Sequence, residues 1–249
     1  MSGHSKWSQI KRQKGVTDAR RGQLFTKLAR EISVVVRQGG VDPQANFKLR
    51  LVVQKARDCN MPLENIDRAI KRASGGAEGA ALSEVTYEVY GPGGSAILVQ
   101  VLTDNKNRTV SEVRNILSRG GGNLGEAGCV TWGFDAKGVI HIDAAKVNAE
   151  EVALFAIDAG ADDVKVEGTT VEVITQPHDL EAVRKALELN KIPVSSSELS
   201  MVPKTLVKLD EKSALQALRL LDKLEELDEV QRVYINADFP DDVVGKYQG

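Results

Sequence analysis

The sequence predicts an α+β protein of three domains, and three observations lead to that prediction. Apolar residues recur at helical spacing in the first third of the chain, and strand-like segments alternate with helical ones after about residue 85. The order from residue 138 to 202 is β-α-β-β-α-β, which is typical of a ferredoxin-like domain. We therefore expect a basic arm and three-helix bundle over 1–78, an α/β middle domain over 79–135 plus 203–249, and a ferredoxin-like domain over 136–202 inserted into it.

The bundle is predicted from three segments with recognisable ends. Asp18 begins a helix that runs to about Gln38, with apolar residues at helical spacing and a glycine pair after it. Asp42-Pro43 offers an N-cap and a first-turn proline for a second helix. Pro62 begins a third helix, which another glycine pair ends. Three helices with short connections form a small bundle.

The remaining elements divide between two domains. In the middle domain we expect strands at 85–90, 95–103 and near 128–134, with a helix at 108–118. In the inserted domain we expect strands at 139–142, 163–167, 170–175 and 197–202, with helices at 147–158 and 179–190. A strand (205–209), a helix (211–226) and a strand (230–235) follow. These last three elements bury too little to stand alone, so we expect them to complete the sheet begun at 85–134.

Charge is divided unevenly along the chain. Residues 1–72 contain 16 Lys and Arg against 6 Asp and Glu, and since the whole chain has 33 and 35, the remainder has 17 and 29. The overall net charge of −2 hides this division. A basic third on an acidic body predicts a partner that is a polyanion such as nucleic acid, the competing interpretation being a solvated basic face.

The candidate binding residues lie in the basic third and in one polar turn. Counterion release from phosphates would supply most of the affinity. Trp7 either stacks on a base or anchors the arm to the bundle, and the polar turn either receives an anion or caps its helix. The third helix offers mainly Arg68, Lys71 and Arg72, and these give it little means of recognising individual bases. The candidates are Lys6, Trp7, Lys11, Arg12, Lys14, Arg20, Arg21, Lys27, Arg30, Asn105, Lys106, Asn107 and Arg108.

Catalytic and cofactor chemistry finds little support. The 120–125 segment, GGGNLG, matches a dinucleotide-binding pattern, but a helix is expected before it and a strand after it, the reverse of what that motif needs. The three histidines and two cysteines lack metal-ligand spacing, and Cys59 and Cys129 are expected to be free thiols. We expect no enzyme, no catalytic residue, no metal and no cofactor. The polar N-terminus and short apolar runs predict a cytoplasmic protein that does not enter membranes.

Several motifs together resemble the YebC/PmpR family, whose mitochondrial relatives include a translational activator of a cytochrome oxidase subunit. The motifs are GHSKW at 3–7, DARRG at 18–22, LFTKLAREI at 24–32, NMP at 60–62, NIDRAI at 65–70, YGPGG at 90–94, LTDN at 102–105, NRT at 107–109 and GGNLGE at 121–126. The departures are small: Ala127 and Cys129 stand where Ser or Pro, and Ser, are common.

The resemblance implies the three-domain fold described above and a non-enzymatic regulator of gene expression. Bacterial members are usually described as DNA-binding transcriptional regulators, while others resemble ribosome-associated translation factors that ease synthesis through proline-rich stretches. The partner is therefore duplex DNA or ribosomal RNA, with the ribosome itself as a further candidate and no small-molecule substrate expected. A basic arm and glycine-rich loops favour the ribosome without deciding between the two. A protein-interaction scaffold is the third hypothesis, and binding that ignores salt would favour it.

Overall fold

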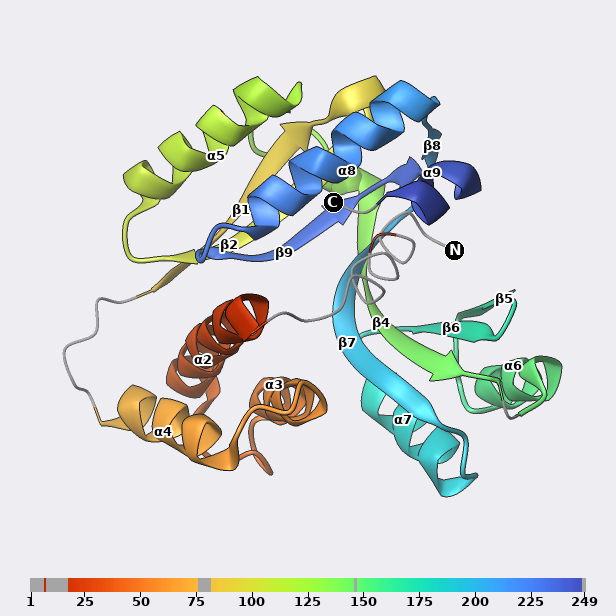
Figure 1. Cartoon of the computed structure of the whole chain (residues 1–249). Coiled ribbons are helices and arrows are strands. Elements are labelled where there is room, and N and C mark those ends of the chain that lie inside the picture. Colours follow the sequence, from red (N-terminus) through yellow and green to blue (C-terminus); the bar gives the residue numbers. More distant parts are fainter. Residues whose placement is uncertain (1–6, 8–17, 76–81, 146, 248–249) are drawn as a thin grey trace. The chain divides into compact units, whose positions relative to one another are not determined.

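The computed structural model describes residue 7 and residues 18–75, 82–145 and 147–247 (Figure 1). It confirms a mixed α+β fold with a helical N-terminal region followed by sheets. The described chain forms two compact units, one of residues 135–202 and the other of the residues before and after that segment. The helical bundle and the middle sheet thus belong to one unit. The exact limits of three domains stay a prediction.

The bundle consists of α2 (Asp18–Gly39), α3 (Phe47–Asp58) and α4 (Leu63–Ser74), packed around their own apolar core. The expectation that Asp42-Pro43 begins the second helix is wrong. Residues 42–46 form a turn, and Asn46 is the N-cap, accepting a hydrogen bond from the Leu49 amide at 3.0 Å. The Asn46 amide also donates to the Val35 backbone oxygen at 2.8 Å, so this buried side chain joins the end of α2 to the start of α3.

The middle sheet has the order β3-β1-β2-β9, and α5 and α8 cover one of its faces (Figure 1). Apolar residues of these helices and of alternate strand positions share one core, as expected for an amphipathic sheet face. The strands are antiparallel, with Tyr87 opposite Val99 and Val99 opposite Val233. The bounds are β1 (Ser83–Tyr90), β2 (Ala96–Thr103), α5 (Lys106–Gly120), β3 (Asn123–Leu124), α8 (Glu211–Glu225) and β9 (Val230–Ile235).

Two expectations for this sheet need correction. The segment 205–209 does not join it: β8 (Val207–Lys208) pairs instead with β10 (Ala237–Asp238), and α9 (Asp241–Lys246) follows. The segment near 128–134 is a turn that ends in a short 3-10 helix at Thr131–Gly133 rather than a strand. The Glu88 carboxylate binds the backbone amides of this turn, so they are not available to a neighbouring strand.

The inserted unit has the strand order β5-β6-β4-β7, with two helices crossing between strands. On one face Val171 and Val173 of β6 are fully buried, in register with Val166 and Val164 of β5. On the other face His141 lies opposite Glu172, and both are buried. The bounds are β4 (Phe134–Asp143), α6 (Ala149–Asp158), β5 (Asp163–Glu167), β6 (Thr170–Thr175), α7 (Leu180–Leu189) and β7 (Val194–Pro203).

The two connections to this unit begin beside each other. The Lys204 amide, just after β7, donates to the Gly133 backbone oxygen, just before β4, at 2.9 Å. This hydrogen bond lies on the middle-domain side of both connections. The chain therefore leaves and re-enters the middle domain at neighbouring residues.

Candidate nucleic-acid interface

The predicted cations divide between the arm and α2. Lys6, Lys11, Arg12 and Lys14 lie outside the described residues, and Arg20 is described only as part of the α2 backbone. Arg21 is exposed in the first turns of α2. Arg30 is half-buried, and its Nη1 has no hydrogen-bond partner among the described atoms. The predicted cationic face of α2 therefore does not present all of its side chains to solvent.

The Lys27 side chain contacts the middle domain. Its Nζ donates to the backbone oxygen of Glu225, the last residue of α8, at 2.5 Å. One turn earlier on α2, Gln23 donates from Nε2 to the Glu226 backbone oxygen at 2.6 Å and to Asp228 Oδ1 at 3.2 Å. The last carbonyls of a helix have no partner within the helix, and cations stabilise that end. Lys27 and Gln23 thus cap α8.

Trp7 is 1% exposed and belongs to the apolar core beneath α5 and α8. Its Nε1 donates to Glu225 Oε1 at 3.2 Å. An indole buried to this extent offers no face to a nucleobase, so this geometry contradicts stacking and favours the anchoring interpretation. The anchor differs from the expected one, because Trp7 packs into the middle domain rather than the bundle. An indole whose N–H finds a partner is a common way to bury tryptophan.

The polar turn between β2 and α5 acts mainly as a cap. Asn105 is the N-cap of α5, and its side chain accepts from the Arg108 amide at 3.1 Å. Arg108 pairs with Asp104 at 2.7 Å and Glu229 at 3.0 Å, and the Asp104 carboxylate raises the pKa of its guanidinium. The remaining candidates of the turn, Lys106 and Asn107, are exposed. The backbone amide and the guanidinium of Arg108 already have partners within the protein. The turn is therefore poorly suited to binding an anion.

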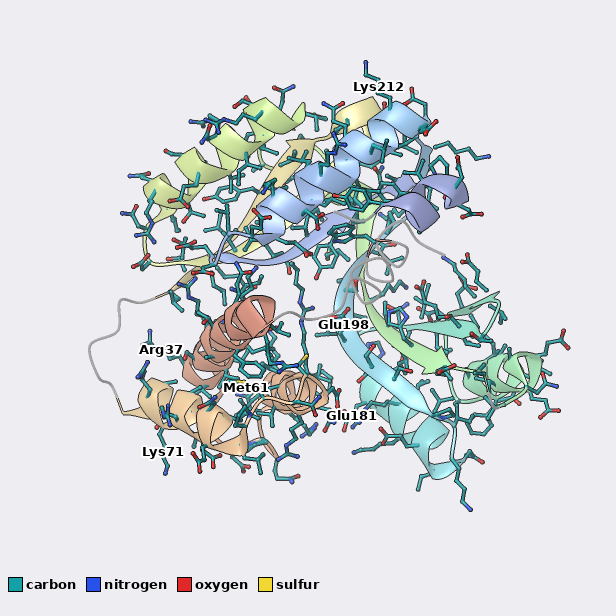
Figure 2. The ribbon with its side chains drawn as sticks, in the orientation of Figure 1. Arg37, Met61, Lys71, Glu181, Glu198 and Lys212 are labelled. Atoms are coloured by element: carbon teal, nitrogen blue, oxygen red, sulfur yellow. The ribbon has the colours of Figure 1, made fainter. Side chains whose placement is uncertain are left out.

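A cationic group that the candidate set left out lies on α4. Arg68, Lys71 and Arg72 stand at i, i+3 and i+4, so they share one face of the helix. All three are exposed, and no acidic side chain in the described part of the chain pairs with them. Figure 2 shows the Lys71 side chain extending from α4 away from the bundle. The i, i+3 and i+4 spacing in the sequence indicates a phosphate-binding face, even though the helix has few side chains suited to reading bases.

The glycine-rich segment after α5 has the geometry expected of a helix end. Gly121, with a φ of 76°, is the left-handed C-cap of α5, and β3 begins two residues later. A helix therefore precedes the segment and a strand follows it, the reverse of the order that a dinucleotide-binding motif needs. Cys59 and Cys129 are free thiols, as expected. Within the described ranges, no group of three His, Cys, Asp or Glu residues is placed to hold a metal ion, and no helix has the length and hydropathy to cross a membrane.

Comparison with known proteins identifies the family. The model of the TACO1/YebC protein N-terminal domain matches residues 5–76, and the model of the TACO1/YebC second and third domain matches residues 82–237. The chain belongs to the TACO1/YebC family. This confirms the family resemblance drawn from the sequence motifs. Residues 77–81 lie between the ranges that the two family models match.

TACO1/YebC relatives match along nearly the whole chain. A protein of Dehalococcoides mccartyi strain BAV1, named a probable transcriptional regulatory protein, is 54% identical over 247 residues, covering 99% of this chain and 98% of that protein. A protein of Chloroflexus aurantiacus strain J-10-fl with the same name is 54% identical over 250 residues, covering 99% of each. The crystal structure of a conserved hypothetical protein from Aquifex aeolicus matches with a TM-score of 0.83 and 44% identity, covering 90% of this chain and 92% of that one.

Proposed function

We propose that this chain is a non-enzymatic regulator of gene expression that binds nucleic acid through cations of its helical bundle. The observation that carries the proposal is the exposed triplet Arg68, Lys71 and Arg72, which has no ion-pair partner among the described residues. Cations without protein partners attract phosphates and release counterions when they bind. The names of the bacterial relatives support a role in transcription, with duplex DNA as the polyanion.

The binding we propose is dominated by phosphates. The other exposed side chains of α4 include Glu64 and Asp67, whereas its one amide side chain, Asn65, is half-buried. Bidentate contacts to bases come from Asn, Gln or Arg at groove edges, so this helix has few means of reading sequence. Contacts to phosphate position a protein without specifying bases. We therefore expect affinity to fall steeply with salt and to depend only weakly on sequence.

The test is a duplex-DNA titration across a salt series with two triple variants. Replacing Arg68, Lys71 and Arg72 by Gln removes up to three phosphate contacts, so the slope of log K against log salt should fall by up to about 3. The matched control replaces Arg114, Arg119 and Lys212, exposed cations of α5 and α8, by Gln and removes the same charge. Equal losses in both variants, or none in the α4 variant, would reject α4 as the binding element.

The weak base-reading equipment of α4 also supports a second candidate, a translation factor that binds ribosomal RNA. Double-stranded RNA is recognised largely by its shape, its 2′-hydroxyls and its phosphates, which suits a helix with charged side chains. Co-sedimentation with ribosomes, run across the same salt series as the DNA titration, separates the two. Ribosome binding that persists near physiological salt while DNA binding collapses would favour translation. Binding that ignores salt would favour a protein scaffold instead.

A further inference from the structure

The solvent face of α6, in the inserted unit, carries two apolar side chains in the open. Leu154 is 70% exposed and Ile157 is 47% exposed. They stand at i and i+3 and so lie beside each other on the helix surface. The opposite face of α6 packs through Val152 and Ala156, which are buried. Single exposed apolar residues are ordinary, but an adjacent pair at the centre of a helix face is the pattern of an anchor site.

Carboxylates surround this pair. Glu150 and Glu151 precede Leu154 by four and three residues, and Asp158 follows it by four, so all three are its neighbours on the helix. All three are exposed, and α6 contains no Lys or Arg. In the described part of the chain no cation forms an ion pair with any of them. Among the described residues, the face therefore has an apolar centre and a negative rim whose carboxylates have no ion-pair partner.

The neighbouring edge strand, β5, also exposes an apolar side chain close to carboxylates. β5 packs against α6 and is the outer strand of its sheet. Val166 of β5 lies on the helix-covered side, in register with the buried Val171, yet it is itself exposed. Asp162 and Asp163 lead into this strand, and Lys137 pairs with the first of them. The exposed apolar surface and its acidic surroundings thus extend beyond α6.

We infer that this face, formed by Leu154 and Ile157 with the rim of Glu150, Glu151 and Asp158, is a docking site for a cationic amphipathic protein segment. Leucines or isoleucines of such a segment would cover the apolar pair, and its lysines or arginines would meet the rim. The rim repels phosphates, so nucleic acid is not the occupant. It also opposes symmetric pairing with a second copy, because that would place the three carboxylates against themselves. This site does not depend on the proposed binding of nucleic acid by α4.

The test uses the full-length protein and a labelled amphipathic peptide, LKKLLKLLKKLLKL, followed by fluorescence anisotropy. The double variant Leu154→Ala with Ile157→Ala should weaken binding at least tenfold, because it removes both anchors. The variant with Glu150→Gln, Glu151→Gln and Asp158→Asn should weaken binding several-fold and flatten its salt dependence. Since all five side chains are exposed, the variants should keep the circular dichroism spectrum of the parent.

A matched control is available on α7. Leu189 is 83% exposed, but Lys185 and Lys191 lie near it in sequence and the adjacent Glu188 pairs with Arg184, so it lacks an uncompensated acidic rim. Leu189→Ala should leave peptide affinity within twofold of the parent. Equal loss in this control, full binding by the Leu154 and Ile157 variant, or equally tight binding of oligolysine would overturn the inference. So would self-association in sedimentation that the Leu154 and Ile157 variant abolishes, since the occupant would then be a second copy.

Discussion

The Lys27 ammonium of α2 lies 2.5 Å from the backbone oxygen of Glu225, the residue that ends α8. A side chain that its sequence context marks as a phosphate ligand is thus used as a cap for a helix of another domain. Arg232 of β9 forms a second link between the same parts, meeting Glu31 of α2 at 3.0 Å. The bundle and the middle domain are therefore joined by a helix cap and by an ion pair whose cation belongs to the middle domain.

Lys27→Met should lower the free energy of unfolding by about 1 kcal/mol, because the apolar stem stays while the hydrogen bond to the α8 terminus is lost. Urea unfolding measures this change, and DNA affinity should stay within about twofold of the parent value. Lys48→Met, at an exposed position of α3, is the control and should leave stability unchanged. A large loss of DNA affinity with unaltered stability would show that Lys27 contacts phosphate instead.

Glu88→Gln should destabilise the protein by about 3 kcal/mol, since hydrogen bonds to a buried carboxylate are among the strong ones. Its carboxylate accepts from the Gly128, Val130 and Thr131 amides at 2.5, 2.7 and 2.8 Å. A Gln amide keeps one acceptor oxygen, but its NH2 group would face at least one of these backbone N–H donors. Glu84→Gln, exposed on the same strand, should change stability by less than about 0.5 kcal/mol. Equal midpoints in urea for the two variants would contradict the anchoring role of Glu88.

The Glu88 carboxylate also predicts how the free energy of unfolding changes at acidic pH. Burial acts to raise the pKa of Glu88, but hydrogen bonds from the Val130, Gly128 and Thr131 amides prevail and lower it from 4.5 to about 2. A lowered pKa stabilises the fold above about pH 4.5, and that contribution is lost as pH falls towards 2. Unfolding free energy measured between pH 5 and 2 should therefore drop more steeply for the parent than for Glu88→Gln. Parallel curves would refute this.

Glu172 should give the free energy of unfolding the opposite dependence on pH. Burial in the inserted unit raises its pKa to about 7, against the opposing charge of Lys165, which lies across from it on β5. A raised pKa stabilises the fold below about pH 4.5, and the contribution disappears as pH rises to 7. Relative to Glu172→Gln, the parent should lose about 3 kcal/mol over that interval. Glu150→Gln, an exposed control in the same unit, should follow the pH curve of the parent.

The two tryptophans should report on separate environments. Trp132 is 73% exposed and Trp7 is buried, so Trp132→Phe should leave a blue-shifted emission and Trp7→Phe a red-shifted one. In the Trp132→Phe protein, saturating duplex DNA should leave the emission nearly unchanged, because Trp7 lies in an apolar core. Strong quenching of this single-tryptophan variant would instead show that the indole leaves the core to stack on bases.

Sequence periodicity predicted the helices and most strands because their apolar faces are built from neighbouring residues. It also predicted the element order of the inserted unit, because those elements follow one another without interruption. The start of α3 was missed because of a local turn, whereas the failures in the middle domain and the arm share another cause, which is contact between residues distant in sequence. Glu88 determines the shape of a turn about 40 residues later, and Trp7 packs beside a helix that ends at Glu225. Spacing could place Lys27 on the charged face of α2, but nothing local indicated that α8 ends against it.

The hydrogen bond between Lys204 and Gly133 has a consequence for how such a protein can change over evolutionary time. Because the two ends of the insertion already lie beside each other, the inserted segment does not determine the distance between the host residues that flank it. Length changes, replacement by another module or complete excision in favour of a tight turn would each leave the host sheet with the same two end points. The geometry of these two end points therefore permits changes in the inserted domain without redesign of the part of the chain that carries it.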